Sequence, residues 1–302
     1  MTSQTITVAA SGTWKLGDLT VNRVGFGAMR LTQHGEAFAD DAVPRDRDQA
    51  IGVLRRAVVL GVNHIDTAAF YFSPLRSANE LINQALAPYP DDLVITTKVG
   101  PSRDPSGQWL PHATPEQLRG QVEENLRQLG RDHLDVVNLR IVGTDSIAER
   151  FGALTDLREA GLIRHLGLSN IRPHQLAEAQ SIAPVVCVQN MYGVGASSEQ
   201  KEFLDSCGEQ RIAFVPFYSI AGTGRTAGAT TDHSREVRAI ARAHGVSAAQ
   251  IRLAWTLHQG PHVLAIPGTG DPDHLAQNVA VGSLRLSQEE LTALDPLHHQ
   301  TA

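Results

Sequence analysis

The stretch TPEQLRGQVEENLRQLGRDHLDVVNLR, residues 114–140, combines the signals of a helix with those of a strand. Its first residues, Thr114-Pro115-Glu116, form a helix cap with proline at the first helical position. Apolar residues then recur at helical spacing, at Leu118, Val122, Leu126 and Leu129. The stretch ends in a short β-rich run, Leu134–Arg140. It therefore predicts a helix that is followed at once by a strand.

The same alternation recurs along the chain. Helical spacing appears again over residues 50–58, before Gly61, and over residues 247–257. The other β-rich runs are Val24–Phe26, His64–Asp66, Leu93–Thr97, Ile163–Ser169, Val186–Met191, Ala213–Phe217 and Val263–Ile266. Such alternation is typical of a parallel sheet with right-handed crossovers. Eight strand–helix units within about 250 residues predict an α/β fold, a (β/α)8 TIM barrel that occupies residues 1–302 as a single domain.

A β-hairpin is predicted before the barrel. Thr13–Leu16 and Leu19–Val21 are joined around Gly17-Asp18, and we expect this hairpin to plug the bottom of the barrel. The alternative architecture is a doubly wound open sheet that binds a dinucleotide. That fold needs a G-x-G-x-x-G segment after its first strand, whereas Gly25–Met29 is too short and lacks the third glycine. The barrel is therefore favoured.

Composition excludes several classes of function. The 302 residues are 42% hydrophobic and carry a net charge of −6, which offers no basic surface for nucleic acid. No apolar run approaches the roughly 18 residues of a membrane span, and the N-terminus lacks the pattern of a secretory signal. Two cysteines cannot form a disulfide framework, and no H-E-x-x-H spacing indicates a metal. We expect a soluble, cytoplasmic protein without a metal site.

Polar residues gather where the predicted strands end, which is where barrels of this type carry their chemistry. Asp66 and Lys98 close the second and third strands, Arg140 closes the fourth, and Tyr71 follows Asp66 in a loop. A phenol is a poor acid at neutral pH, but a neighbouring ammonium that a carboxylate holds in place lowers its pKa. Such a group could protonate a carbonyl oxygen. The alternative is a structural Asp–Lys ion pair beside a tyrosine that only packs.

Residues 61–68, GVNHIDTA, with Tyr71 five residues after Asp66, resemble the aldo-keto reductase superfamily. The resemblance extends over almost the whole chain and implies that Asp66, Tyr71 and Lys98 are catalytic. The fourth catalytic residue of the superfamily is a histidine, whereas this chain has Arg140. Arginine at that place, after Val-Val-Asn-Leu, resembles the bacterial pyridoxal reductase branch. We therefore include Arg140 in the predicted catalytic group.

The resemblance also implies where a nicotinamide cofactor binds. Ser169, Asn170 and Gln189 stand at the ends of neighbouring strands and supply the donors and acceptors that a carboxamide needs. The superfamily places them on the nicotinamide carboxamide, and it places Phe217 under the nicotinamide ring. An ordinary core phenylalanine is the alternative for Phe217.

The segment after the eighth strand, Ile266–Gly270, is a glycine-rich turn that leads into a helix, where free N–H groups favour an anion. By resemblance it holds the adenosine and its 2′-phosphate, with Gln277 and Asn278 on the adenine. Relatives that bind NADPH often have lysine and arginine where this chain has glycine and His274. The phosphate contacts predicted here are therefore backbone amides and residues of the turn, the helix and the long loop after the seventh strand: Gly268, Thr269, His274, Gly222 and Arg225. NADPH is the expected cofactor and NADH the alternative, with an NADPH preference that weakens as His274 loses its proton.

The expected reaction is the NADPH-dependent reduction of a small-molecule aldehyde or ketone to the alcohol, with pyridoxal, reduced to pyridoxine, as the leading substrate. Two alternatives stay open. One is a carbonyl reductase of broad range or of another substrate class. The other is a regulatory or binding module that holds a cofactor and catalyses weakly, because the catalytic group is altered at Arg140.

Overall fold

The computed structural model describes residues 7–39, 42–220 and 233–295. Its largest sheet has the strand order β11-β10-β9-β8-β7-β4-β3, and every pairing in it is parallel. The strands of this sheet are β3 Phe26–Gly27, β4 His64–Asp66, β7 Val94–Val99, β8 Leu134–Arg140, β9 Ile163–Ser169, β10 Val185–Gln189 and β11 Ala213–Phe214. The predicted parallel α/β architecture is confirmed.

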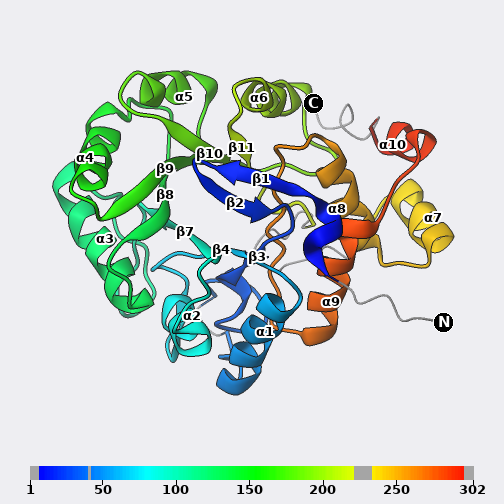
Figure 1. The fold of residues 1–302 in the computed structure, drawn as a ribbon, viewed down its shortest axis with the longest axis horizontal. Helices are drawn as coiled ribbons and strands as arrows, with labels where there is room; N and C mark the ends of the chain where they lie inside the picture. Colours follow the sequence, from blue (N-terminus) through cyan, green and yellow to red (C-terminus); the bar gives the residue numbers. More distant parts are fainter. Residues whose placement is uncertain (1–6, 40–41, 221–232, 296–302) are drawn as a thin grey trace.

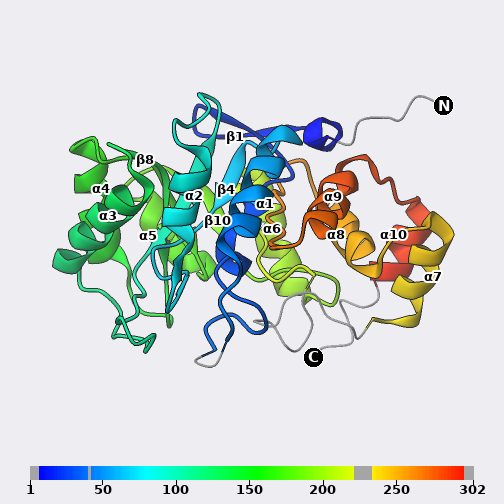
Figure 2. The ribbon, with the colours of Figure 1, turned by 90° about the horizontal axis from the view of Figure 1, so that it is seen from below.

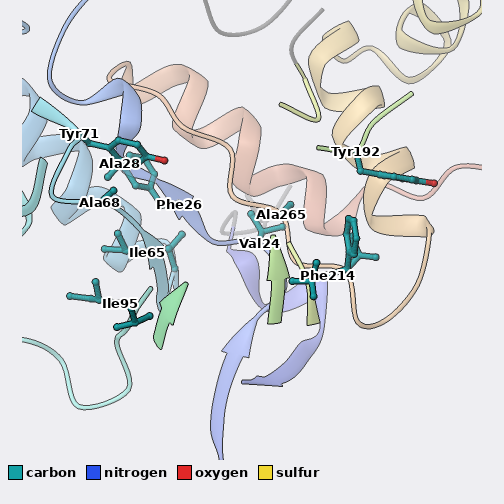
Figure 3. Packing of buried hydrophobic residues seen from close by; sticks show 14 of the residues in the cluster. Val24, Phe26, Ala28, Ile65, Ala68, Tyr71, Ile95, Tyr192, Phe214 and Ala265 are labelled. Carbon is teal, nitrogen blue, oxygen red and sulfur yellow. The ribbon is translucent and has the colours of Figure 1, made fainter. Parts of the chain in front are cut away.

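The sheet closes on itself through an eighth segment. Val263 bridges Phe214 of β11, and Ala265 bridges Val24 just before β3, both in parallel. Figure 3 shows Val24 and Ala265 side by side where the first and last segments meet. The (β/α)8 barrel is therefore confirmed, although two predicted strands are shorter than expected. Pro216, which has no N–H to donate, follows β11, and the predicted eighth strand is present only as bridges.

Helices surround the barrel, as Figure 1 shows. They are α1 Arg47–Val59, α2 Ala78–Leu86, α3 Pro115–Leu129, α4 Ala148–Glu159, α5 Pro173–Gln180, α6 Ser198–Glu209, α7 Arg235–His244, α8 Ala248–His258, α9 Pro272–Ala280 and α10 Gln288–Leu294. Thr114 caps α3 through a capping box with Gln117, which explains why the predicted helix begins there. None of the helices in the described part of the chain is long and apolar enough to cross a membrane.

Short elements complete the fold: 3-10 turns at η1 Val8–Ser11, η2 Ala28–Arg30 and η4 Val281–Ser283, and the small hairpin of β5 Phe72–Ser73 with β6 Arg76–Ser77. The N-terminal hairpin consists of β1 Thr13–Leu16 and β2 Leu19–Asn22, as predicted. Leu16 and Val21 pack in one buried cluster with Val94 and Val136, which lie at the beginnings of barrel strands. The hairpin therefore plugs the N-terminal end of the barrel, and the loops that follow the strands lie at the opposite end (Figure 2).

Side chains alternate between the inside and the outside of the barrel with the period of two that strands impose. On β8, Val136 belongs to the inner cluster, whereas Val137 and Leu139 belong to the outer core beneath the helices. The inward side chains that follow Val136 on this strand are Asn138 and Arg140. Because of this alternation, the last inward side chain of each strand lies at the C-terminal mouth of the barrel.

Candidate active site

The last inward residues of neighbouring strands meet at the C-terminal end of the barrel. Strand register places Arg140 of β8 beside Ser169 of β9, and Ser169 beside Gln189 of β10. A cavity of about 350 Å³ opens over this layer. Four predicted catalytic residues line it: Asp66, Lys98 and Arg140 from strand ends, and Tyr71 from a loop. Gln189, Phe217 and Gly268 also belong to the lining. The structure thus brings together all four residues that were predicted to be catalytic.

Asp66 and Lys98 form a buried ion pair at the floor of the cavity. Lys98 Nζ donates to Asp66 Oδ1 at 2.6 Å and to the carbonyl oxygen of Thr67 at 3.0 Å. The other carboxylate oxygen of Asp66 accepts from Gln189 Nε2 at 2.8 Å. Burial acts to lower the pKa of Lys98, but Asp66 and then Tyr71 outweigh it, so that the pKa lies above its ordinary value. Lys98 is therefore a fixed cation.

A buried polar network behind the strands holds this pair in position, and sequence reasoning missed it. Thr67 Oγ1 donates to Asn79 Oδ1 of α2 at 2.7 Å, and Asn79 Nδ2 donates to Asn125 Oδ1 of α3 at 3.0 Å. The same Asn125 oxygen accepts from Thr97 Oγ1, next to Lys98, at 2.6 Å. A polar residue on the inner face of an otherwise amphipathic helix, as Asn125 is among Leu118, Val122 and Leu129, is the signal that could have revealed it.

Tyr71 lies against Lys98 in the loop after β4. The ammonium nitrogen is 4.8 Å from the centroid of the phenol ring. Phe70 and Phe38 pack against the same ring, with centroids 5.1 Å and 5.9 Å away, and only 8% of Tyr71 is exposed. Tyr71 lines the cavity, so a carbonyl compound bound there could meet its hydroxyl group.

Burial decides the direction in which the pKa of Tyr71 moves. Removal from water raises the pKa above its ordinary value, while Lys98 and Arg140 act to lower it and Asp66 to raise it. The sequence-based expectation of a lowered pKa is therefore wrong in its net direction, because it counted the charges and left out desolvation. The consequence is that Tyr71 carries its proton at neutral pH, as a proton donor must.

Arg140 points into the cavity. Its Nη1 donates to Ser169 Oγ at 3.2 Å, and its guanidinium carbon lies 5.2 Å from the centroid of the Phe217 ring. Within the described residues Arg140 forms no ion pair. The Arg140 side chain therefore faces the cavity and does not turn away to pair with an acid of a loop in the described part of the chain.

The residues predicted to hold the nicotinamide occupy different environments. Ser169 and Gln189 are buried, with Ser169 Oγ donating to Gln189 Oε1 at 3.4 Å. Phe217 lines the cavity and bridges Met191 rather than ending a strand. Asn170 is exposed, has a left-handed backbone with φ 60°, and donates through Nδ2 to the carbonyl oxygen of Ile141 at 2.8 Å. Asn170 therefore lies beside the cavity rather than in its lining.

The residues predicted to hold the adenosine end lie around the start of α9. Thr269 and Asn278 are buried, whereas His274 and Gln277 are exposed. Asp271 is the N-cap of α9, and its carboxylate accepts from the N–H groups of Asp273 and His274. The expectation of free N–H groups at this helix is therefore wrong, because Asp271 occupies them. Gly222 and Arg225 lie outside the described residues.

The lining fits a nicotinamide cofactor by its chemistry. Phe217 offers an apolar ring face, Gln189 offers an amide, and Arg140 supplies a cation. Ser169 is buried behind this lining, where its hydroxyl group accepts from Arg140. The cavity continues past Pro267 to Gly268, toward the turn before α9. A dinucleotide could thus lie from Tyr71 to α9 across the barrel mouth.

Residues 23–298 match the family model described as the aldo/keto reductase family. The chain belongs to this family and is therefore an NAD(P)H-dependent oxidoreductase that acts on carbonyl groups, with NADPH as the family's cofactor. This confirms the resemblance that the sequence motifs indicated.

Two curated relatives and one solved structure show which family members this chain is similar to. The chain is 42% identical over 298 residues to pyridoxine 4-dehydrogenase of Escherichia coli (strain K12), covering 96% of this chain and 100% of the relative. It is 30% identical to methylglyoxal reductase YeaE of the same organism, with 92% of each chain covered. A solved structure of aldo/keto reductase from Klebsiella pneumoniae in complex with NADP and acetate superposes with a TM-score of 0.74 at 27% identity, covering 92% of each chain.

Proposed function

We propose that this protein uses NADPH to reduce an aldehyde to the primary alcohol, and that its substrate is pyridoxal, which gives pyridoxine. The contact of Lys98 with both Asp66 and the Tyr71 ring carries the catalytic part of the proposal. The pyridoxal part is supported by the 42% identity to pyridoxine 4-dehydrogenase, and by Arg140 in the place of the usual histidine.

Tyr71 supplies the proton in this mechanism. NADPH, when bound, supplies the hydride that the carbonyl carbon receives. The carbonyl π electrons move to the oxygen, which takes the hydroxyl proton of Tyr71, so that the alcohol forms and the phenolate remains. Lys98 stabilises that phenolate because its charge is fixed against the ring by Asp66. Solvent then returns a proton to Tyr71.

The walls of the cavity suit a small, flat aldehyde. Phe38, Phe70 and Trp109 all line it, and their rings pack on one another, with centroids 5.3 Å apart for Phe38–Trp109 and 5.7 Å apart for Phe70–Trp109. Aromatic walls favour a planar ring by stacking. A cavity of about 350 Å³ is also in the range for small ligands. Arg140 donates to the carbonyl oxygen of pyridoxal or to the phenolic oxygen beside it on the same substrate, since a guanidinium offers several donors and stays charged.

Oxidation of NADPH, followed with a panel of carbonyl compounds, tests the proposed function. The panel contains pyridoxal, methylglyoxal and a simple aliphatic aldehyde, each with NADPH and with NADH. We expect the highest kcat/KM with pyridoxal and NADPH. A higher kcat/KM with another carbonyl would replace pyridoxal by that substrate class, and tight binding of NADPH without turnover of any compound would support the binding module instead.

Replacement of Arg140 by histidine tests its electrostatic role. Arg140 lowers the pKa of Tyr71 against the larger effect of burial, so its loss should raise that pKa further. Reduction needs the protonated phenol, and its alkaline limb follows the loss of this proton. We therefore expect the alkaline limb of the kcat profile of Arg140→His to move to higher pH, while kcat/KM for pyridoxal falls.

The control for this measurement is Arg119→His, since Arg119 is exposed on α3 and its one ion pair in the described part of the chain is with the surface residue Glu123. It should leave the pH profile unchanged. An unmoved alkaline limb in Arg140→His, together with unchanged substrate preference, would remove Arg140 from the site's chemistry.

A further inference from the structure

Arg45, in the loop before α1, lies against the glycine-rich turn that precedes α9. Its Nη1 donates to the carbonyl oxygen of Gly270 at 3.3 Å, and its Nε donates to that of Arg30 at 3.3 Å. A Cβ at residue 270 would lie 2.1 Å from Arg45 Nε. The absence of a side chain at Gly270 therefore provides the space in which this guanidinium sits.

Arg30 brings a second cation to the same place. It lines the active-site cavity together with Gly268, and its Cγ lies 3.5 Å from where a Cβ of Gly268 would be. The two guanidiniums are close enough for Arg45 to lower the pKa of Arg30, in addition to the lowering that burial causes, while Glu36 acts in the opposite direction. Two positive charges are thus held near each other at partly buried positions, an arrangement that an anion would stabilise.

The turn itself offers no such charge. Residues 266–274 contain neither lysine nor arginine, and His274 is exposed. The carboxylate of Asp271 accepts hydrogen bonds from the N–H groups at the start of α9, so these donors are not available to a phosphate. A phosphate bound here must therefore be attracted by cations from another part of the chain. Asp271 is near enough to raise the pKa of Arg45, although burial outweighs this effect and lowers the pKa. Within the described residues no salt-bridge contact joins the two side chains, and neither of the two hydrogen bonds of Arg45 uses Nη2.

The place of Arg45 along the site indicates which phosphate it meets. Tyr71 marks the reacting end, and the cavity extends from there to Gly268. Arg45 lies beyond Gly268, at Gly270, where Gln49 of α1 also donates to the Gly270 carbonyl oxygen at 3.0 Å. α1 and α9 run beside each other at this point (Figure 1). This is the end of the site that is farthest from the chemistry, where the adenosine half of a dinucleotide would lie.

We propose that Arg45, with Arg30 beside it, binds the 2′-phosphate of NADPH and gives this protein its preference for NADPH over NADH. The inference rests on the proposed use of NADPH. It assigns the role of phosphate recognition to the loop between β3 and α1 in place of His274, and the charge of arginine does not change near neutral pH. The preference should therefore not weaken between pH 6 and pH 8, because the arginines stay charged while the 2′-phosphate, with a second pKa of about 6, gains negative charge.

Binding of NADP+ and NAD+, measured by titration calorimetry without substrate, tests this assignment. In Arg45→Met the Kd for NADP+ should rise roughly 10- to 100-fold, as expected when charge-assisted hydrogen bonds to a phosphate are lost, while the Kd for NAD+ stays within about twofold. Gly270→Ala should act in the same direction, because its methyl group displaces the guanidinium. The matched control is Arg47→Met. Arg47 is exposed and lies two residues after Arg45 in the sequence, and its substitution removes the same charge from the protein.

Several outcomes would overturn the assignment. If Arg45→Met lost the same factor of affinity for NADP+ and for NAD+, Arg45 would bind the pyrophosphate instead. Unchanged affinity of this variant for both dinucleotides would exclude Arg45 from the cofactor site. A preference of the wild-type protein for NADP+ that disappears between pH 6 and pH 8 would return the role to His274. Failure of the wild-type protein to bind either dinucleotide would contradict the proposed function itself, so the two failures are distinguishable.

Discussion

Tyr71→Phe should retain the fold and the cofactor affinity of the wild-type protein and lose most of its activity. The change keeps the ring that packs against Phe38 and Phe70 and removes only the hydroxyl group. Loss of a general acid costs about 10²–10⁴-fold in rate, and we expect kcat for pyridoxal reduction to fall by that factor. Because the proton is transferred in the chemical step, the Kd for NADPH should stay within about twofold.

Tyr89→Phe is the control for this substitution. Tyr89 donates its hydroxyl group to the carbonyl oxygen of Leu129, far from the cavity lining, so its loss affects stability at most. Wild-type kcat in Tyr71→Phe would exclude Tyr71 as the proton donor, whatever its position in the cavity.

Lys98→Met should strongly destabilise the protein. Among the described residues, it leaves the buried carboxylate of Asp66 with the amide of Gln189 as its one side-chain partner. Removing one partner of a buried ion pair costs about 3–5 kcal/mol, and denaturant unfolding should show a loss of this size, together with a loss of activity.

A double substitution separates charge from packing. Asp66→Asn in the Lys98→Met background removes the uncompensated charge and should restore part of the free energy of unfolding, while activity stays lost. Lys201→Met is the matched control, because the Lys201–Asp205 pair is only half-buried at the surface of α6 and should contribute at most about 1 kcal/mol. A loss in Lys98→Met no larger than this would show that the buried pair does not stabilise the fold.

Periodic patterns explain why the barrel and its mouth could be predicted from sequence. The C-terminal ends of parallel barrel strands meet at one mouth, so the polar residues that close the predicted strands could be grouped without coordinates. This placed Asp66, Lys98 and Arg140 correctly around one cavity. The hairpin plug followed from the same kind of local signal, two short strands joined at a glycine.

The adenosine end could not be predicted in the same way. Arg45 lies 225 residues from Gly270 in the sequence, and no local pattern relates a loop arginine to a distant glycine. That Asp271 accepts from the first N–H groups of α9, in contrast, could have been predicted from the sequence. Aspartate followed by proline is a common helix start in which the aspartate is the N-cap. The direction of the Tyr71 pKa was missed for a third reason, since desolvation depends on packing that charges in a sequence do not reveal.

The proposed function requires that hydride passes from NADPH to the aldehyde carbon of pyridoxal. Its most direct test is the reaction of the protein with pyridoxal and NADPH that carries deuterium at both C4 positions, with the product examined by mass spectrometry. We expect pyridoxine that carries a single deuterium on the new alcohol carbon, and little such product with Tyr71→Phe. Pyridoxine without deuterium, or no pyridoxine at all, would contradict it.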